Sequence, residues 1–131
     1  MLPIVEAPPR DPYATPKIDP EVAARWLVAF LRDECIGRRG MYHAVVGLSG
    51  GVDSAVTAYL CARALGPQNV HLIRMPYRLS SPASLHDAQL VIDALGAVGH
   101  TVDISAAVDG YLQFEPDADP RRRGNVLART R

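Results

Sequence analysis

The stretch GLSGGVDSAVTAYLCARALG, residues 47–66, packs two glycines, two serines and an aspartate into the six positions 49–54. A short apolar run precedes these positions, and a longer run follows in which Val56, Tyr59 and Leu60 recur at helical spacing. Such a pattern is typical of a buried strand, a tight turn and a helix. In an open parallel sheet this turn lies beyond the carboxyl end of its strand, where ligands bind.

The rest of the chain repeats the alternation of strands and helices. Asp19 and Pro20 carry the signals for the start of a helix, with an apolar stripe formed by Val22, Trp26, Leu27, Phe30 and Leu31. Ser84 is expected to cap a later helix. We expect helices over 19–35, 52–65, 84–96 and 106–114, and strands over 42–48, 70–75 and 100–105. This order predicts an α/β fold with an open, doubly wound, Rossmann-like parallel sheet covered on both faces.

The ends of the chain differ from its middle. Six of the 11 prolines lie in the first twenty positions, so residues 1–18 are expected to form an extended arm and residues 19–131 one domain. The segment EPDADPRRRG, residues 115–124, is expected to interrupt the helices, and NVLARTR to begin a last helix. We expect the first helix to end at Gly37 and Gly40.

The overall composition excludes several classes of protein. The chain has 131 residues, 48% of them apolar and 21% charged, which is typical of a soluble globular domain. Bases and acids balance at 14 each, which argues against bulk affinity for nucleic acid or an anionic membrane. Cys35 and Cys61 have no metal-type spacing and are interpreted as core thiols. Without a disulfide framework or a long apolar run, the sequence predicts a cytoplasmic protein.

The glycine turn has the chemistry of a phosphate site. Main-chain N–H groups at a helix start lack partners inside the helix and lie at the positive end of its dipole, and Gly50 and Gly51 let that backbone approach a ligand. Asp53 would repel a phosphate unless a cation such as Mg²⁺ lies between them. The alternative is that Ser49 or Asp53 simply caps the helix. Neither GxxxxGK[ST] nor GxGxxG is present.

Three motifs give a more specific interpretation. SGGVDS resembles the pyrophosphate loop of the ATP pyrophosphatase (PP-loop) superfamily. RMPYRLSSPASLHDAQL, residues 74–90, and RRRGNVLARTR, residues 121–131, are similar to the corresponding segments of NAD synthetase. The resemblance spans 45–131 and implies the adenine nucleotide alpha hydrolase-like fold. It also implies a truncated chain, because the family continues for a comparable length with further strands and a second acidic metal ligand.

The resemblance implies ATP-dependent amidation of deamido-NAD to NAD through an adenylate, with release of AMP and pyrophosphate. Ammonia, free or derived from glutamine, would be the nitrogen source, and Mg²⁺ would accompany ATP. Asp53 would hold the metal, Arg74 would contact ATP, and Arg129 would lie near deamido-NAD across a homodimer interface. The implied ATP-binding residues of the turn are Gly47, Leu48, Ser49, Gly50, Gly51, Val52, Asp53 and Ser54.

Some features leave alternatives open. Many relatives have glutamine where this chain has Ser80 and Ser81, and lysine where it has Leu127. No side chain is assigned as a nucleophile or a base. Another PP-loop enzyme, similar to GMP synthetase or to a tRNA-modifying enzyme, would explain the turn, although GNVLARTR weighs against it. A non-catalytic ATP-binding fragment would explain the missing second half.

Overall fold

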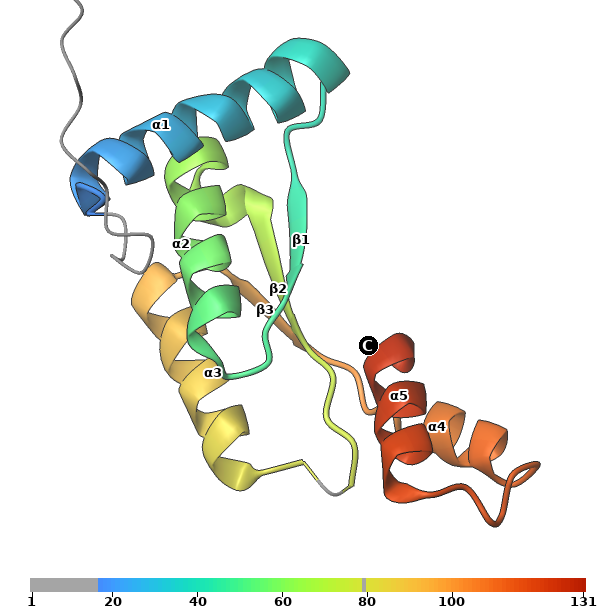
Figure 1. The fold of residues 1–131 in the computed structure, drawn as a ribbon. Coiled ribbons are helices and arrows are strands. Elements are labelled where there is room, and N and C mark those ends of the chain that lie inside the picture. Colours follow the sequence, from blue (N-terminus) through green and yellow to red (C-terminus); the bar gives the residue numbers. More distant parts are fainter. Residues whose placement is uncertain (1–16, 79) are drawn as a thin grey trace, which may run out of the picture.

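The computed structural model describes residues 17–78 and 80–131, so nearly all of the predicted arm, residues 1–18, lies outside the described part. Three parallel strands form its sheet in the order β1-β2-β3 (Figure 1). The strands are β1 (Ala44–Gly47), β2 (Val70–Arg74) and β3 (Val98–Thr101). Ala44 pairs with Val70, and His71 pairs with Val98. The predicted open α/β parallel sheet is confirmed.

Helices connect and flank these strands (Figure 1). They are α1 (Pro20–Arg32), the π-helical turn η1 (Asp33–Gly37), α2 (Val52–Leu65), the 3₁₀ turn η2 (Pro67–Asn69), α3 (Pro82–Leu95), α4 (Ser105–Leu112) and α5 (Pro120–Thr130). The predicted bounds of α2 match the structure. Its signals are unambiguous, because glycines stand at both ends and Gly66 adopts a φ of 89° that favours glycine.

The main core lies between one face of the sheet and the helices α2 and α3. Val70 and Leu72 are fully buried there, as is Ala58 of α2. Right-handed crossovers that advance along the sheet in one direction place both connecting helices on the same face. Among the described residues the opposite face stays open, and Val45 on it is 68% exposed. The expected helical cover of both faces is therefore present on one.

Helix α1 packs on α2 through only part of the apolar stripe that the spacing indicated. Val28 and Leu31 contact the core, and the Arg32 Nε donates to the Ala64 carbonyl over 2.8 Å. Trp26 of that stripe is 65% exposed and stacks on Phe30, with 5.7 Å between the ring centroids, so this part of the stripe points away from the core. Spacing alone therefore did not decide which apolar residues of this helix face the core.

The expected end of the first helix at Gly37 is wrong, since helical turns continue to residue 39. Glu34 forms ion pairs with Arg38, over 3.0 Å, and with Arg39, which hold these turns. Gly40 then ends the helix with a φ of 63°. The helix therefore continues through Gly37, the first expected stop, and the ion pairs of Glu34 lie across this continuation.

Three other boundaries also differ from expectation. α3 begins at Pro82, with Ser81 rather than Ser84 before it. β3 occupies 98–101 instead of 100–105, because α4 already begins at Ser105, whose N–H donates to Asp103 Oδ1 over 2.7 Å. α5 begins inside the segment expected to break the pattern, where the Asp119 carboxylate accepts from the Arg122 N–H over 2.7 Å. An N-cap followed by proline thus outweighed the arginine run.

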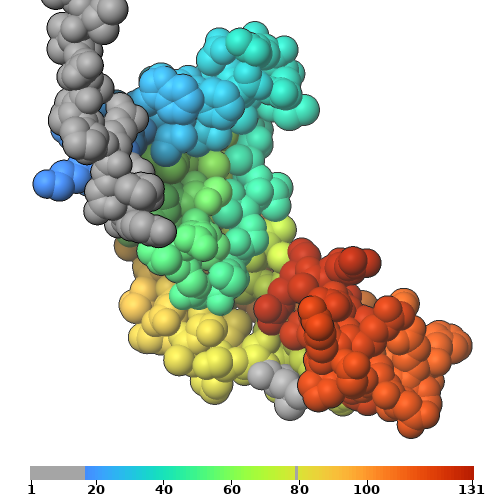
Figure 2. Space-filling view, in the orientation of Figure 1, coloured from blue at the N-terminus to red at the C-terminus, as the bar shows by residue number. Residues whose placement is uncertain are grey.

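Helices α4 and α5 form a small lobe at the carboxyl end of the sheet, coloured orange and red in Figure 2. Its core consists of Tyr77, Ile104, Val108 and Leu112, with Met75 and Val126 packed against them. Because Met75 and Tyr77 follow β2 directly, this second cluster joins the lobe to the sheet. Arg122 also clamps the lobe through two bonds of 2.6 and 2.7 Å to the Glu115 carboxylate, which lower the pKa of Glu115.

Both cysteines belong to the main core and are free thiols, as predicted. Burial raises the pKa of the Cys61 thiol, which disfavours its reactive thiolate form. Within residues 17–78 and 80–131, we find no helix with the length and apolar character that a membrane span requires.

The packing of β3 on α3 gives a stability prediction. A Cβ added at Gly99 would lie 2.9 Å from Cγ2 of Ile92, a buried side chain that is stiff at χ1. We expect Gly99→Ala to lower the free energy of unfolding by about 1–3 kcal/mol in urea denaturation. Gly110→Ala in α4 is the control, because its Cβ meets nothing within 4 Å. A Gly99→Ala variant as stable as Gly110→Ala would contradict this packing.

Candidate functional site

The glycine turn lies between β1 and α2, at the carboxyl end of the sheet. Leu48 anchors it, since its side chain is 6% exposed and its N–H donates to the Ile73 carbonyl over 2.8 Å. Leu48 therefore contributes backbone to the site and side chain to the core. Ser49 and Asp53 are exposed, as the predicted binding role requires.

Gly50 has the most constrained backbone in this turn. Its φ is 84°, in the region that side chains disfavour, and a Cβ placed on it would lie 2.3 Å from the Ser84 carbonyl oxygen. The turn thus packs backbone to backbone against the first turn of α3. Only glycine permits this approach, so Gly50 fixes the spacing between the glycine turn and the first turn of α3.

The serines of the turn hold one another rather than capping α2. Ser49 Oγ accepts from the Gly51 N–H over 3.2 Å and lies 3.1 Å from Ser54 Oγ, which itself donates to the Gly51 carbonyl over 2.9 Å. Gly51 occupies the N-cap position, without a side-chain cap. The alternative in which Ser49 or Asp53 caps the helix is therefore wrong. The main-chain N–H groups at the start of α2 therefore receive no side-chain cap, and such groups suit an anionic ligand.

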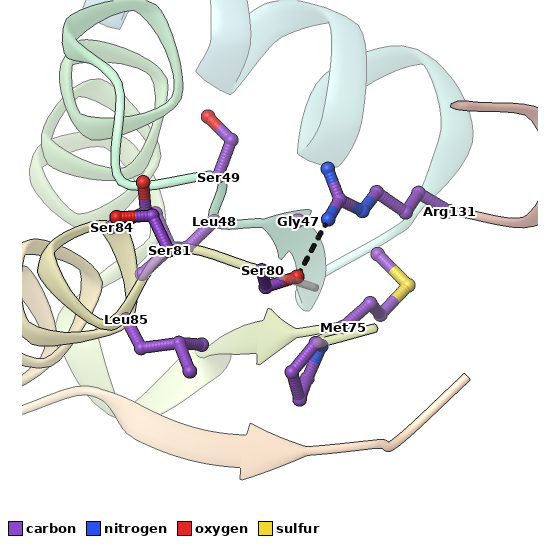
Figure 3. A pocket seen from close by; sticks show the side chains of 10 residues that line it. Gly47, Leu48, Ser49, Met75, Ser80, Ser81, Ser84, Leu85 and Arg131 are labelled. Carbon is purple, nitrogen blue, oxygen red and sulfur yellow. Dashed lines mark hydrogen bonds between the residues drawn. The ribbon is translucent and has the colours of Figure 1, made fainter. Parts of the chain in front are cut away.

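A pocket of about 380 Å³ opens beside the turn. Its walls come from the end of β1 and the turn after it, the loop after β2, the start of α3 and the residue that follows α5 (Figure 3). It is lined by Gly47, Leu48, Ser49, Met75, Pro76, Ser80, Ser81, Ser84, Leu85 and Arg131. The predicted turn and the second motif thus meet at one site, at the sheet edge where ligands bind in such folds.

Arg131 is the residue that the sequence reasoning missed. Its Nη2 donates to Ser80 Oγ over 3.1 Å, and in Figure 3 the side chain approaches from the side of the pocket opposite Leu85. It belongs to the same ARxR motif as Arg129. Two residues apart on a helix differ by about 200° in direction, so both cannot face one pocket. The motif was a sufficient signal to find the segment but not to choose between its arginines.

Arg129 lies instead in a second hollow of about 360 Å³ between α4 and α5. Tyr111, Arg122, Asn125 and Thr130 share this hollow. Its polar and cationic walls suit an anion or a ligand rich in hydroxyl groups. The structure therefore does not bring Arg129 together with the glycine turn.

Arg74 lies at the end of β2 and is absent from the lining of the first pocket. Its Nη2 donates to Thr101 Oγ1 over 2.7 Å, while its Nε is buried with no hydrogen-bond partner within the described part. A buried donor without a partner is costly and uncommon. Arg74 thus directly precedes Met75, which lines the pocket, and its Nε–H group is available to donate a hydrogen bond.

Asp53 is the acidic group of the turn and lies in the first turn of α2. Across the described ranges there is no cluster of three or more His, Cys, Asp or Glu side chains that would hold a metal by itself. Mg²⁺ is commonly held by one or two carboxylates together with phosphate oxygens and water. The single exposed carboxylate of Asp53 would therefore need ligands from outside the described residues to complete the coordination of a cation.

Comparison with known proteins identifies the family. The family model for NAD synthase matches residues 23–131, which is most of the chain. The chain belongs to the NAD synthase family. The predicted resemblance is thereby confirmed, and all three motifs that carried it lie inside the matched residues.

Curated members of the family are similar to this chain in sequence. The NH(3)-dependent NAD(+) synthetase of Trichlorobacter lovleyi is 50% identical over 114 residues, which are 87% of this chain and 41% of that protein. The enzyme of the same name from Chlorobaculum parvum is 48% identical over 105 residues, 80% of this chain and 38% of that protein. The chain therefore spans about two-fifths of the length of these relatives.

Solved structures of the family share the fold. The NH3-dependent NAD synthetase from Campylobacter jejuni, in complex with nitrate, superposes with a TM-score of 0.77 at 29% identity, over 86% of this chain and 48% of that one. The glutamine-dependent NAD+ synthetase from Acinetobacter baumannii, in complex with ADP, gives 0.78 at 28% identity, over 89% and 23%. The NMN synthetase from Francisella tularensis gives 0.77 at 28% identity, over 86% and 47%.

The constraint at Gly50 gives a prediction for the site. Gly50→Ala forces a positive φ on a side chain and drives its Cβ into the Ser84 carbonyl, so we expect a loss of about 2 kcal/mol or more in the free energy of unfolding. Gly51→Ala is the matched control, because its Cβ meets only Ser49 Oγ, at 3.3 Å. Urea unfolding of both variants makes the comparison, and equal midpoints would show that the close approach is absent.

Proposed function

We propose that this chain forms the ATP-binding part of an NAD synthetase, which amidates deamido-NAD to NAD through an adenylate and releases AMP and pyrophosphate. The observation that carries the proposal is the glycine turn at the carboxyl end of β1, opening on a pocket in a chain of the NAD synthase family. The names of the curated relatives support the same reaction.

The turn is proposed to bind the β and γ phosphates of ATP. Its proposed donors are the main-chain N–H groups of residues 49–54, reinforced by the dipole of α2. The hydroxyl groups of Ser49 and Ser54 already point at each other across the turn, at 3.1 Å, and each would exchange that contact for a phosphate oxygen. The adenosine half of ATP would occupy the adjoining pocket beside Met75 and Leu85.

Mg²⁺ would supply charge neutralisation at the departing pyrophosphate, and Asp53 is the residue proposed to hold it. The exposed carboxylate stands in the first turn of α2, beside the proposed phosphate positions. In this arrangement Asp53 attracts the phosphates through the cation instead of repelling them.

The arginines divide between the two substrates in this proposal. Arg74 would contact ATP, and its buried Nε, which has no hydrogen-bond partner among residues 17–78 and 80–131, supports this role. Arg129 would bind deamido-NAD in the hollow between α4 and α5, close to a homodimer interface. Arg131 lines the proposed ATP pocket, whereas Arg129 does not, so Arg131 is the arginine of the ARTR motif proposed to contact ATP.

The reaction needs positioning more than a reactive side chain. The nicotinate carboxylate attacks the α phosphorus of ATP, and the bond from that phosphorus to the bridging oxygen breaks as pyrophosphate leaves. Ammonia then attacks the acyl carbon of the adenylate, AMP leaves, and one proton is released as the amide forms. The amides of the turn stabilise the departing pyrophosphate by electrostatics, so the absence of an assigned nucleophile or base is consistent with this chemistry.

The setting of the reaction belongs to the same proposal. Ammonia arrives free or from a glutaminase, and the enzyme works as a cytoplasmic homodimer without nucleic acid or membrane partners. A second candidate is an ATP-binding module without turnover, which the same glycine turn and pocket would serve. Another amidating or thiolating PP-loop enzyme is distinguished by substrate, since it would accept XMP or tRNA.

A binding experiment tests the proposed metal and phosphate site. We expect calorimetry to show binding of ATP that depends on Mg²⁺, and Asp53→Asn to weaken it about tenfold by removing the carboxylate that holds the cation. Asp93→Asn on α3 is the control, because the Asp93 carboxylate lies outside the site and accepts from Gln89 Nε2, over 2.7 Å, on its own helix. Binding that is independent of both Mg²⁺ and Asp53 would contradict the proposal.

A chimera tests turnover. Residues 23–131 would replace the aligned part of the Trichlorobacter lovleyi synthetase, whose 50% identity favours a compatible fold. With ATP, Mg²⁺, ammonia and deamido-NAD we expect NAD, AMP and pyrophosphate in equal amounts, and the parent enzyme is the control. A folded chimera that binds ATP without making NAD would favour the non-catalytic module, and release of ADP would reject the reaction.

A further inference from the structure

Tyr77 connects the sheet to the α4–α5 lobe. It follows β2 and Pro76, its side chain is 9% exposed, and its ring lies in the second core with Ile104 and Val108. A buried phenol requires a partner for its hydroxyl. That partner is Asp109 of α4, whose Oδ1 accepts from the Tyr77 hydroxyl over 3.0 Å.

The same oxygen of Asp109 accepts a second bond. Arg78 Nη2 donates to it over 2.9 Å, and the Arg78 guanidinium also lies 5.6 Å from the Tyr77 ring centroid. Neighbouring Ser105 Oγ accepts from the Arg78 main-chain N–H over 3.1 Å. Two consecutive residues of the loop after β2 are therefore bound to α4 by side chain and main chain.

Hydrogen bonds within the loop after β2 connect Tyr77 to residues that line the pocket. The Tyr77 N–H donates to Ser80 Oγ over 2.9 Å, and the Ser80 N–H donates to the Tyr77 carbonyl over 2.7 Å. Ser80 Oγ in turn accepts from Arg131 Nη2 over 3.1 Å. Both Ser80 and Arg131 line the pocket, so a chain of direct contacts runs from Asp109 to its wall.

We propose that Asp109 is a positioning residue for the ATP pocket: by holding Tyr77 and Arg78 it fixes the turn that carries Ser80 and the place where Arg131 docks. Asp109 itself does not line the pocket. The nucleotide part of this inference rests on the proposed function. The same contacts join the lobe that bears Arg129 and Arg131 to the ATP side, so Asp109 also sets how the two halves of the site face each other.

The first readout needs no nucleotide. Asp109→Ala removes the acceptor for two donors, and we expect the main-chain amides of Arg78 and Ser80 to exchange with solvent about tenfold faster by NMR. Asp109→Asn keeps an oxygen acceptor in the same place, so it restores most of the protection. Tyr77→Phe removes one of the two bonds and reproduces part of the loss even where Asp109→Ala folds poorly. Asp93→Ala is the matched control and leaves both amides unchanged.

The second readout is the affinity for ATP with Mg²⁺, measured by calorimetry on the same variants. We expect the Kd to rise about five- to tenfold in Asp109→Ala and to recover in Asp109→Asn, while Asp93→Ala matches the original chain. Tyr77→Phe combined with Asp109→Ala should cost less than the sum of the two, because they break one shared bond.

The two readouts separate the possible failures. Unchanged exchange in both Asp109→Ala and Tyr77→Phe overturns the positioning role outright. Faster exchange with an unaltered Kd shows that the turn does not serve the nucleotide, and it overturns the role as well. If the original chain binds no ATP, the proposed function fails, and the exchange experiment still reports whether Asp109 holds the turn.

Discussion

The site depends on one close approach between two segments of backbone. Gly50, with its φ of 84°, leaves no room for a side chain against the Ser84 carbonyl, and this contact fixes the glycine turn against the first turn of α3. With Leu48 anchored in the core and bonded to β2, the turn is held from both sides. Its main-chain donors are then presented in one arrangement before any ligand arrives, so binding does not carry the full entropic cost of ordering them.

Two parts of the molecule form the site. The main core supports the glycine turn, and the α4–α5 lobe completes the pocket through Arg131, which follows α5. Strand β2 serves both parts. Its residues Val70 and Leu72 are fully buried in the main core, while Met75 and Tyr77 beyond its end enter the core of the α4–α5 lobe. The position of Arg131 therefore depends on how one short segment after β2 is held. A pocket built from two lobes in this way is sensitive to residues that no ligand touches.

How far the sequence predicts this structure varies with the kind of signal. Helix α2 was placed correctly because glycines at both ends and the buried strand before it agree with one another. The predicted start of β3 was two residues too late. All four residues of this edge strand are exposed, so the sequence carries no alternation of apolar and polar residues that would mark its bounds. The start of α5 differs from expectation because segment 115–124, with its prolines and arginines, was expected to interrupt the helices, whereas Asp119 and Pro120 are an N-cap and a first helical residue.

The same limits apply to the site. Local backbone chemistry was predictable, because two adjacent glycines before a helix have few other uses. Which arginine of ARTR reaches the pocket was not, since it depends on the rotation of α5 about its axis, set by Val126 and Leu127 packing on the lobe core. The contacts of Asp109 were also beyond prediction, because they join residues 31 and 32 positions apart along the chain.

The central claim is that the turn at the start of α2 grips the tail of a nucleoside triphosphate. A crystal structure of this chain grown with ATP and Mg²⁺ tests it most directly. We expect phosphate oxygens within hydrogen-bond distance of the main-chain N–H groups of 49–54, with Mg²⁺ between them and Asp53. Nucleotide bound elsewhere, or a turn that keeps its Ser49–Ser54 contact while ATP is present at saturation, would contradict it.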